Sequence, residues 1–305
     1  MDIGFVTNPS SNDPIHSTST IWRANLFNHM RVALAEVQGM VMDVAWSPDE
    51  SSVAYLVYTD APGMVSGSAH QLWLKAGKAP ARALTPLIPL FGRGGSLDDQ
   101  TIVRFSHDGK YLLMVDTYVA GGPPATPDQA IVQVHSVPDG SLVFVPPSAL
   151  SQPGNKFFYY VTMAAWSHQT DRLYYRDRDG VQVWEPNMYS TQKTIAAGLN
   201  WFLPSISPGD RFVAYVVTEG GSSLSQPHVE VRDLATNAVR VIPGIRAAPF
   251  FVSDTLLLVA EYGPNPEQGP GPSYVPTGKG FFFDVRTNVE TQTKEVISPI
   301  DYWPH

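Results

Sequence analysis

Two stretches of the sequence are near copies of each other and decide the fold. The first is Val44-Ala45-Trp46-Ser47-Pro48-Asp49, which precedes the apolar run Val53-Ala54-Tyr55-Leu56-Val57. The second is Val103-Arg104-Phe105-Ser106-His107-Asp108-Gly109, which precedes Tyr111-Leu112-Leu113-Met114. Pro fixes φ, Asp and Ser side chains bond nearby amides, and Gly allows a positive φ. Each stretch therefore predicts a strand, a tight turn and a second strand.

The pattern returns three more times along the chain. The further copies are Ala165-Trp166-Ser167-His168 before Leu173, Ser205-Ile206-Ser207-Pro208-Gly209-Asp210 before Phe212, and Phe251-Val252-Ser253-Asp254 before Leu256. After each hairpin we expect a loop, a third strand with alternating polarity, a turn and a short fourth strand. No convincing helical pattern intervenes, and residues 24–36 are best interpreted as a turn between two strands.

Repeated four-stranded antiparallel meanders predict an all-β chain that folds as a β-propeller. Residues 3–7, 20–23 and 31–34 supply the second, third and fourth strands of a first blade, which lacks its innermost strand. The C-terminal Tyr302-Trp303-Pro304-His305 aligns with Phe202-Leu203-Pro204-Ser205, the start of an innermost strand. We therefore expect one domain, residues 1–305, with six blades, in which the C-terminal strand completes the first blade.

The hairpin motif resembles the PD40 repeat of TolB-like propellers, which are relatives of the WD40 class, and the resemblance covers essentially the whole chain. It implies the propeller fold and leaves the function open, because such propellers occur as periplasmic adaptors, as gating domains of prolyl-oligopeptidase-like peptidases, and as lyases or hydrolases. The sequence departs from the peptidases, since it has no Gly-x-Ser-x-Gly nucleophile elbow. It departs from the repeat at His107 and His168, where Pro is usual.

Composition excludes several classes of function. Hydrophobic residues make up 43% of the 305 residues, which is too apolar for a disordered chain. The formal net charge of -8 and the lack of a dense Lys/Arg run argue against a nucleic-acid partner. No stretch is apolar for long enough to span a bilayer, and no signal peptide is recognisable. Location stays open: only the resemblance favours an extracytoplasmic protein. We expect a monomer.

Loop lengths separate two ends of the predicted sheets. The turns after first and third strands are short, and Asp108, Asp139 and Asn237 are expected to hold them. The loops between second and third strands, and those between blades, include long ones at 8–19, 61–69, 87–99, 120–129, 220–227 and 262–280. Recognition residues concentrate on loops that a rigid scaffold carries, so this long-loop face is the predicted functional face.

The predicted ligand-binding residues are carboxylates at strand ends and aromatic residues on the long-loop face. They are Asp60, Asp98, Asp99, Phe157, Tyr159, Trp201, Glu219 and Glu261. Two carboxylates at a channel mouth would suit acid–base cleavage of a glycoside, with aromatic rings stacking on sugars, but sequence cannot give their separation. Solvated carboxylates and aromatic residues that pack between blades are the competing interpretation.

No metal site or cofactor is predicted. His16, His70 and His228 each precede a third strand, but they belong to different blades and are not expected to converge. No zinc or calcium motif is present, and Asp177-Arg178-Asp179-Gly180 fits a tight turn better than a calcium loop.

Two functions remain. The first is a non-catalytic module that binds a protein segment or small ligand at the long-loop face and central channel. The second is a hydrolase or lyase of ester or carbohydrate substrates that uses carboxylates, with or without a His, at the channel mouth. The fold alone does not separate them.

Overall fold

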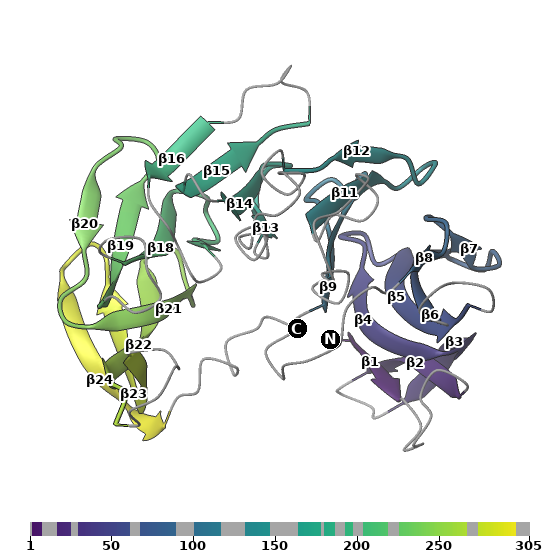
Figure 1. Cartoon of the computed structure of the whole chain (residues 1–305), viewed down its shortest axis with the longest axis horizontal. Helices are drawn as coiled ribbons and strands as arrows, with labels where there is room; N and C mark the ends of the chain where they lie inside the picture. Colours follow the sequence, from purple (N-terminus) through teal and green to yellow (C-terminus); the bar gives the residue numbers. More distant parts are fainter. Residues whose placement is uncertain are drawn as a thin grey trace. The chain divides into compact units, whose positions relative to one another are not determined.

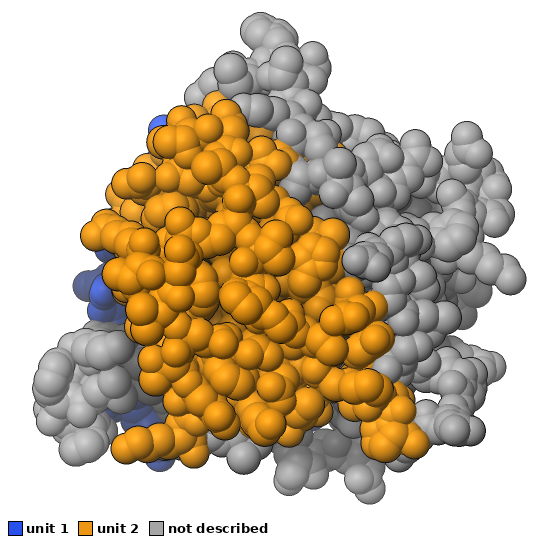
Figure 2. Space-filling view, turned by 90° about the vertical axis from the view of Figure 1, so that its left-hand side faces the viewer, with its two compact units in different colours: residues 1–162 blue, residues 163–305 orange. Residues whose placement is uncertain are grey.

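The computed structural model describes residues 2–7, 17–25, 30–61, 68–89, 101–116, 132–146, 164–177, 180–186, 193–197, 204–218, 226–266 and 274–296. These residues form strands and turns and contain no helix (Figure 1). Accordingly, no helix in this part of the chain is long and apolar enough to cross a membrane. The chain divides into two compact units, residues 1–162 and 163–305 (Figure 2), and each is described separately.

Unit 1 contains three antiparallel sheets. Sheet 1 is formed by β1 (Asp2–Thr7), β2 (Thr18–Asn25) and β3 (Arg31–Gln38). Sheet 2 is formed by β4 (Met40–Trp46), β5 (Ser52–Asp60), β6 (Ser68–Ala76), β7 (Arg82–Ala83) and β8 (Ile88–Pro89), with both β7 and β8 pairing with β6. Sheet 3 is formed by β9 (Thr101–Phe105), β10 (Tyr111–Asp116), β11 (Val132–Ser136) and β12 (Leu142–Phe144).

Unit 2 contains three four-stranded meanders. Sheet 4 is formed by β13 (Ala164–Trp166), β14 (Leu173–Asp177), β15 (Gly180–Trp184) and β16 (Lys193–Ala197). Sheet 5 is formed by β17 (Ser205–Ile206), β18 (Phe212–Thr218), β19 (Pro227–Asp233) and β20 (Val239–Val241). Sheet 6 is formed by β21 (Arg246–Phe251), β22 (Leu256–Pro264), β23 (Tyr274–Asp284) and β24 (Val289–Val296).

These sheets confirm the all-β meanders that the repeat predicts, including the strand pair on either side of residues 26–29. The count of six blades and the closure of a ring are not settled, because residues 297–305 lie outside the described part of the chain. The same holds for the single domain 1–305, which stays a prediction.

The core lies between consecutive sheets. In unit 1, Ile21 of sheet 1 packs with Val41, Tyr55 and Val57 of sheet 2. A second cluster joins sheets 2 and 3, and in unit 2 further clusters join sheets 4 and 5 and sheets 5 and 6. Each middle sheet thus buries both of its faces, which explains why its second strand, such as Val53-Ala54-Tyr55-Leu56-Val57-Tyr58, is apolar without alternation.

The first strands of sheets 3 and 6 donate hydrogen bonds to side chains of the preceding sheet. In unit 1, the backbone N–H of Val103 in β9 donates to Asp43 Oδ2 of β4 at 2.8 Å, and Arg104 Nη1 lies 2.6 Å from the same oxygen. In unit 2, the N–H of Phe251 in β21 donates to Ser205 Oγ of β17 at 2.9 Å. These side chains satisfy amide groups at a sheet edge that would otherwise be unpaired.

The short turns after the first strands carry acidic side chains that reach the preceding sheet. Asp210 has φ +56° and accepts hydrogen bonds from the N–H groups of His168 and Gln169 at 2.9 and 3.0 Å, and from Ser167 Oγ. Glu50, with φ +57°, pairs with Arg23 of sheet 1 at 2.6 Å. The turns therefore align neighbouring sheets as well as closing their own hairpins.

The predicted roles of Asp108 and Asp139 in the short turns are confirmed, and the side-chain role of Asn237 stays a prediction. Asp108 Oδ1 accepts from Ser106 Oγ and the Lys110 N–H, both at 2.9 Å. Asp139 Oδ1 accepts from the Ser141 N–H at 3.1 Å, and bonds from Ser136 and Ser141 lower the pKa of Asp139 to about 2. Asn237 adopts φ +59°, a conformation that Asn tolerates well.

We predict that Asp210→Ala lowers the free energy of unfolding by about 1–2 kcal/mol, because two backbone amides of the sheet 4 turn lose their acceptor. Urea unfolding of the whole chain measures the change. Asp49→Ala is the matched control and should cost less, since among the described residues the Asp49 carboxylate bonds to Ser47 and Ser51 of its own turn. Equal losses in the two variants would show that the contact between the turns of sheets 4 and 5 contributes nothing.

A second prediction concerns His135, which is 3% exposed in β11. Its Nδ1 donates to the Gly140 carbonyl at 3.2 Å, its Nε2 lies 2.9 Å from Gln133 Oε1, and burial lowers the pKa of His135 below 6.5. The unfolded chain then binds a proton at higher pH than the folded chain, so stability should fall as pH drops below about 6.5. His135→Gln should remove this part of the pH dependence of urea unfolding between about pH 7.5 and 5. An unchanged slope in that variant would contradict the assignment.

Candidate functional site

Two of the eight predicted ligand-binding residues, Asp60 and Glu261, lie in the described part of the chain. Asp60 belongs to unit 1 and Glu261 to unit 2. The other six, which are Asp98, Asp99, Phe157, Tyr159, Trp201 and Glu219, lie outside the described residues. Their convergence on one site therefore stays a prediction.

Asp60 occupies the position that the sequence predicts. It is the last residue of β5, it pairs with Ser68 at the start of β6, and it is exposed. Its carboxylate thus lies at the end of a strand, beside the loop that connects β5 to β6.

Glu261 corrects the sequence analysis, because it lies inside a strand rather than at its end. Strand β22 continues to Pro264, and Tyr262, Gly263 and Pro264 pair with residues 276, 275 and 274 of β23. Residues 262–264 and 274–280 of the predicted loop therefore belong to strands. The Gly and Pro content of this segment hid the strand, although Tyr274 and Val275 are strand formers.

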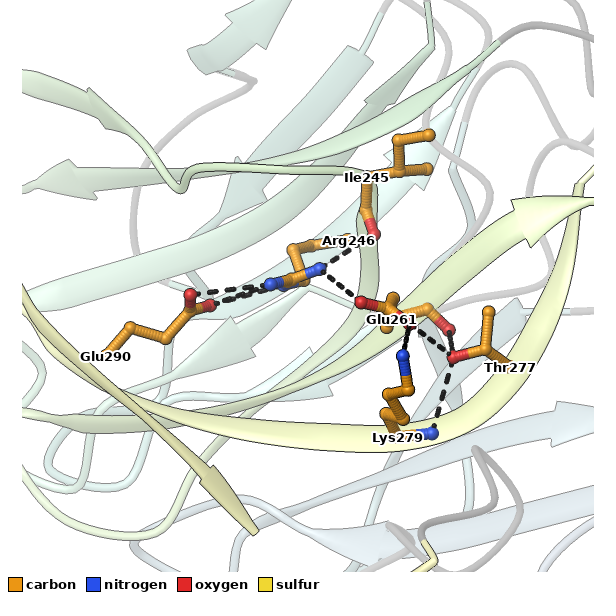
Figure 3. Close-up of polar contacts among 6 residues, drawn as sticks. All are labelled: Ile245, Arg246, Glu261, Thr277, Lys279 and Glu290. Atoms are coloured by element: carbon orange, nitrogen blue, oxygen red, sulfur yellow. Dashed lines mark hydrogen bonds and ion pairs between the residues drawn. The ribbon is translucent and has the colours of Figure 1, made fainter.

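Glu261 belongs to a network that joins all four strands of sheet 6 (Figure 3). At its centre is Arg246, the first residue of β21, which pairs with Glu261 in the ladder and is 7% exposed. The Arg246 guanidinium donates to Glu290 of β24 from Nε and Nη2, both at 3.2 Å from Oε1. Its Nη1 lies 3.5 Å from Glu261 Oε1 and 3.4 Å from the Ile245 carbonyl oxygen.

The network also rests on the face of an aromatic ring. The Arg246 guanidinium carbon lies 3.9 Å from the centroid of the Phe281 ring, at the distance of a cation–π contact. Gly244, with φ +83°, lies close to the same group, and a Cβ there would lie 3.1 Å from Nη1. Both features restrict the guanidinium to one position.

Irregularities in the ladder bring these side chains together. The register shifts between Ala247 and Phe250 in β21, where Ala248 adopts φ +50°, and again between Ala260 and Tyr262 in β22. A third shift sets residues 293–295 of β24 against the single residue Gly280 of β23. Such bulges turn side chains out of the regular alternation, so residues of four strands meet on one patch.

The Glu261 carboxylate is held in its ionised form. Burial raises its pKa, but hydrogen bonds from Thr277 and Lys279 and the charges of Lys279 and Arg246 outweigh burial and lower the pKa below the ordinary value. Thr277 Oγ1 donates to Oε2 at 2.8 Å, and Lys279 Nζ lies 3.2 Å from the same oxygen. Two carboxylates thus balance one guanidinium and one ammonium group.

The sequence analysis missed Arg246, Lys279 and Glu290. Arg246 follows Gly244 at the start of an inner strand, and that position was the one available signal. The contact between Arg246 and Glu290 spans 44 positions along the chain, which no local pattern predicts.

The histidines do not form a metal site in the described part of the chain, where no group of three His, Asp or Glu side chains is close enough to hold an ion. His70 and His228 lie within β6 and β19 rather than before them, which corrects their predicted positions. His70 is fully buried and stacks on Tyr58, with ring centroids 6.4 Å apart. His228 Nε2 lies 3.5 Å from Glu230 Oε1. His16 lies outside the described residues.

Comparisons with known proteins give a fold likeness alone. No protein-family model matches the sequence, and no curated protein matches it. Among solved structures, it is similar to a prolyl endopeptidase studied for inter-domain dynamics, with 14% identity, a TM-score of 0.57, and coverage of 98% of this chain and 41% of the other. A GH74 enzyme from Niastella koreensis has 12% identity and a TM-score of 0.54, with coverage of 89% and 42%.

TolB from Acinetobacter baumannii matches with 15% identity, a TM-score of 0.47, and coverage of 97% of this chain and 64% of TolB. The chain thus spans less than two thirds of the length of these three proteins. The likeness to the endopeptidase and the GH74 enzyme supports a propeller-type fold, and the activities of those proteins are not transferred by it.

We predict that Arg246→Ala lowers the free energy of unfolding by about 3–5 kcal/mol, because the partly buried Glu290 carboxylate loses its cation and Glu261 keeps Lys279 alone. Urea unfolding of the whole chain measures the loss. Arg172→Ala is the control: its exposed pair with Glu185, at 2.5 Å, should contribute less than about 1 kcal/mol. A loss at Arg246 no larger than the loss at Arg172 would contradict a structural role for the network.

Proposed function

We propose that this chain is a TolB-like propeller that acts as a non-catalytic binding module. The binding site is the long-loop face with the central channel, and the ligand is a protein segment or a small molecule. The observation that favours this proposal over the hydrolase alternative is the lowered pKa of Glu261, one of the predicted carboxylates, together with the bonds that its two oxygens make.

A carboxylate that serves as acid or base needs a pKa near the working pH and an oxygen free to reach the substrate. Glu261 offers neither, because its pKa is lowered and both of its oxygens have partners at 2.8–3.5 Å. Its chemistry is structural: it helps to hold β21, β22 and β23 together below the connection from Pro264 to Tyr274. A loop that is anchored on rigid strands is well suited to recognise a ligand.

The proposal includes six blades closed into a ring, with residues 300–305 as the innermost strand of the first blade. Three observations support it. Sheet 1 has three strands among the described residues, whereas the other sheets have four or five. Consecutive sheets within each unit bury a shared apolar cluster. The solved structures with TM-scores above 0.5 cover nearly the whole of this chain.

The test selects peptides that bind the intact protein from a random phage-displayed library, and measures the affinity of synthetic copies by fluorescence polarisation. Asp60→Lys, Trp201→Ala and Glu219→Lys should each weaken binding by about tenfold, which corresponds to about 1.4 kcal/mol. Glu261→Lys is not used, since it would disrupt the Arg246 network. The controls are Asp139→Lys and Asn237→Lys in the short turns, which should leave affinity within about twofold.

Two results would contradict the proposal. One is a set of peptides whose affinity depends on Asp139 and Asn237 but not on the three long-loop positions. The other is turnover in a screen of ester and carbohydrate substrates that is abolished by Asp60→Asn or Glu219→Gln, which would establish the hydrolase or lyase alternative.

A further inference from the structure

Strands β22 and β23 extend past their neighbours in sheet 6. In the described part of the chain, the ladder of β21 with β22 begins at Arg246 and Glu261, and the ladder of β24 with β23 reaches Lys279. Beyond these points residues 262–264 of β22 pair with residues 274–276 of β23. We call this two-stranded segment the arm. Strand edges of this kind can pair with other chains, so the groups on both edges of the arm matter.

The orientation of the β22 backbone in the arm follows from one hydrogen bond. The N–H of Tyr262 donates to the Ile245 carbonyl at 3.0 Å, so it points away from β23. Successive residues of an antiparallel strand direct their N–H and C=O groups to opposite edges. Gly263 therefore faces β23, and Pro264 faces outward like Tyr262.

The same alternation fixes the β23 side of the arm. Gly263 pairs with Val275, so the backbone groups of Val275 point inward, toward β22. The two neighbours of Val275, which are Tyr274 and Pro276, then direct their backbone groups outward. This outer edge lies on the side of β23 where β24 pairs further along the strand.

Both prolines of the arm occupy outward positions. Pro has no N–H, and a strand accepts it without loss only where that N–H would point out of the ladder. Pro264 and Pro276 are both exposed and meet this condition. Four residues of the arm face outward, but the two prolines lack a donor and Tyr262 donates to Ile245, so Tyr274 supplies the one remaining N–H.

A bulge separates the outer edge of the arm from β24. Residues 277–279 of β23 lie opposite the single residue Glu261, and Gly278 adopts φ +84°. Glu261 holds this bulge, because its Oε2 accepts from Thr277 Oγ1 at 2.8 Å and lies 3.2 Å from Lys279 Nζ. Bulges and prolines are both devices that keep sheet edges from pairing with other chains.

Without its proline, the outer edge of the arm would suit a second copy of the chain, since Tyr and Val favour strands. When two such edges pair antiparallel about a twofold axis, Val275 lies opposite its own copy and Tyr274 lies opposite residue 276 of the other copy. Such an outward pair exchanges two hydrogen bonds when both residues have an N–H. Pro276 removes one bond from each pair and places ring carbons where the hydrogen would lie.

We propose that Pro276 is a gatekeeper, which prevents the outer edge of the arm from pairing with a second copy of this chain. The other edge of the arm is closed by Pro264 and by the bond from Tyr262 to Ile245. This proposal supports the monomer expected from the sequence as far as the arm is concerned. It does not depend on the ligand proposed above.

The test uses the absence of cysteine from the chain. Val275→Cys places a thiol at the twofold axis of such a pair, at a non-hydrogen-bonded position where the Cα atoms lie about 4.5 Å apart, a separation that a disulfide can bridge. The whole chain is compared with this substitution alone, with Pro276→Thr added and with Pro264→Thr added. Electrophoresis without reductant measures how fast the covalent dimer forms under mild oxidation.

Pro276→Thr should raise the rate of dimer formation at least about tenfold, because it restores a donor to both outward pairs. Pro264→Thr is the matched control, since it makes the same substitution at the other exposed proline, on an edge where the Tyr262 N–H stays bound to Ile245. It should change the rate by less than about threefold.

Two further controls separate pairing of the arm from other effects. Each rate is divided by the rate at which the same thiol reacts with a small disulfide reagent, which corrects for exposure of the thiol. Urea unfolding shows whether each variant is folded, and Pro276→Val provides a second replacement that restores the N–H.

Two results would overturn the proposal. One is a corrected rate for Pro276→Thr and Pro276→Val that is no faster than the rate for Pro264→Thr. The other is an equal acceleration when the thiol is moved from the arm to the exposed outer strand β20 as Val239→Cys, which would place the new contact away from the arm.

Discussion

The first strands of sheets 3 and 6 are the constraint on which the rest of the structure depends, because only one edge of each pairs within its own sheet. Amides of both strands donate to side chains of the preceding sheet. The N–H of Val103 donates to Asp43 at 2.8 Å, and the N–H of Phe251 donates to Ser205 at 2.9 Å. These polar contacts fix the position at which consecutive sheets pack, and the apolar clusters between sheets then contribute most of the burial.

The residues of the first turns also join consecutive sheets. A residue with positive φ in the first turn of sheets 2 and 5 is acidic, Glu50 or Asp210, and its side chain bonds to the preceding sheet. In sheet 3 the equivalent residue is Gly109, and a Cβ there would lie 3.3 Å from Pro48 of sheet 2. Pro48 thus leaves little room for a side chain at this turn. The repeat therefore encodes contacts between sheets as well as hairpins.

The hairpins could be predicted from sequence because their signals are local. Ser, Pro, Asp and Gly stand next to the apolar runs that they connect, and β4–β5 and β9–β10 formed where these residues indicated. The position of Glu261 could not be predicted, since β22 continues through Gly263 and Pro264, residues that normally end a strand. Arg246 and Glu290 meet only through three register shifts, which depend on the tertiary packing of sheet 6.

Within unit 2, Arg246 links the inner strands of sheet 6 to its outer strand. Through Glu261 it supports the strands below the connection between β22 and β23, and through Glu290 it orders the outer edge of the sheet. The outer edge runs along the side of sheet 6, whereas that connection lies at the end of its second and third strands. A single buried guanidinium, 3.9 Å from the centroid of the Phe281 ring, thus joins the first strand of the sheet to its second, third and fourth strands.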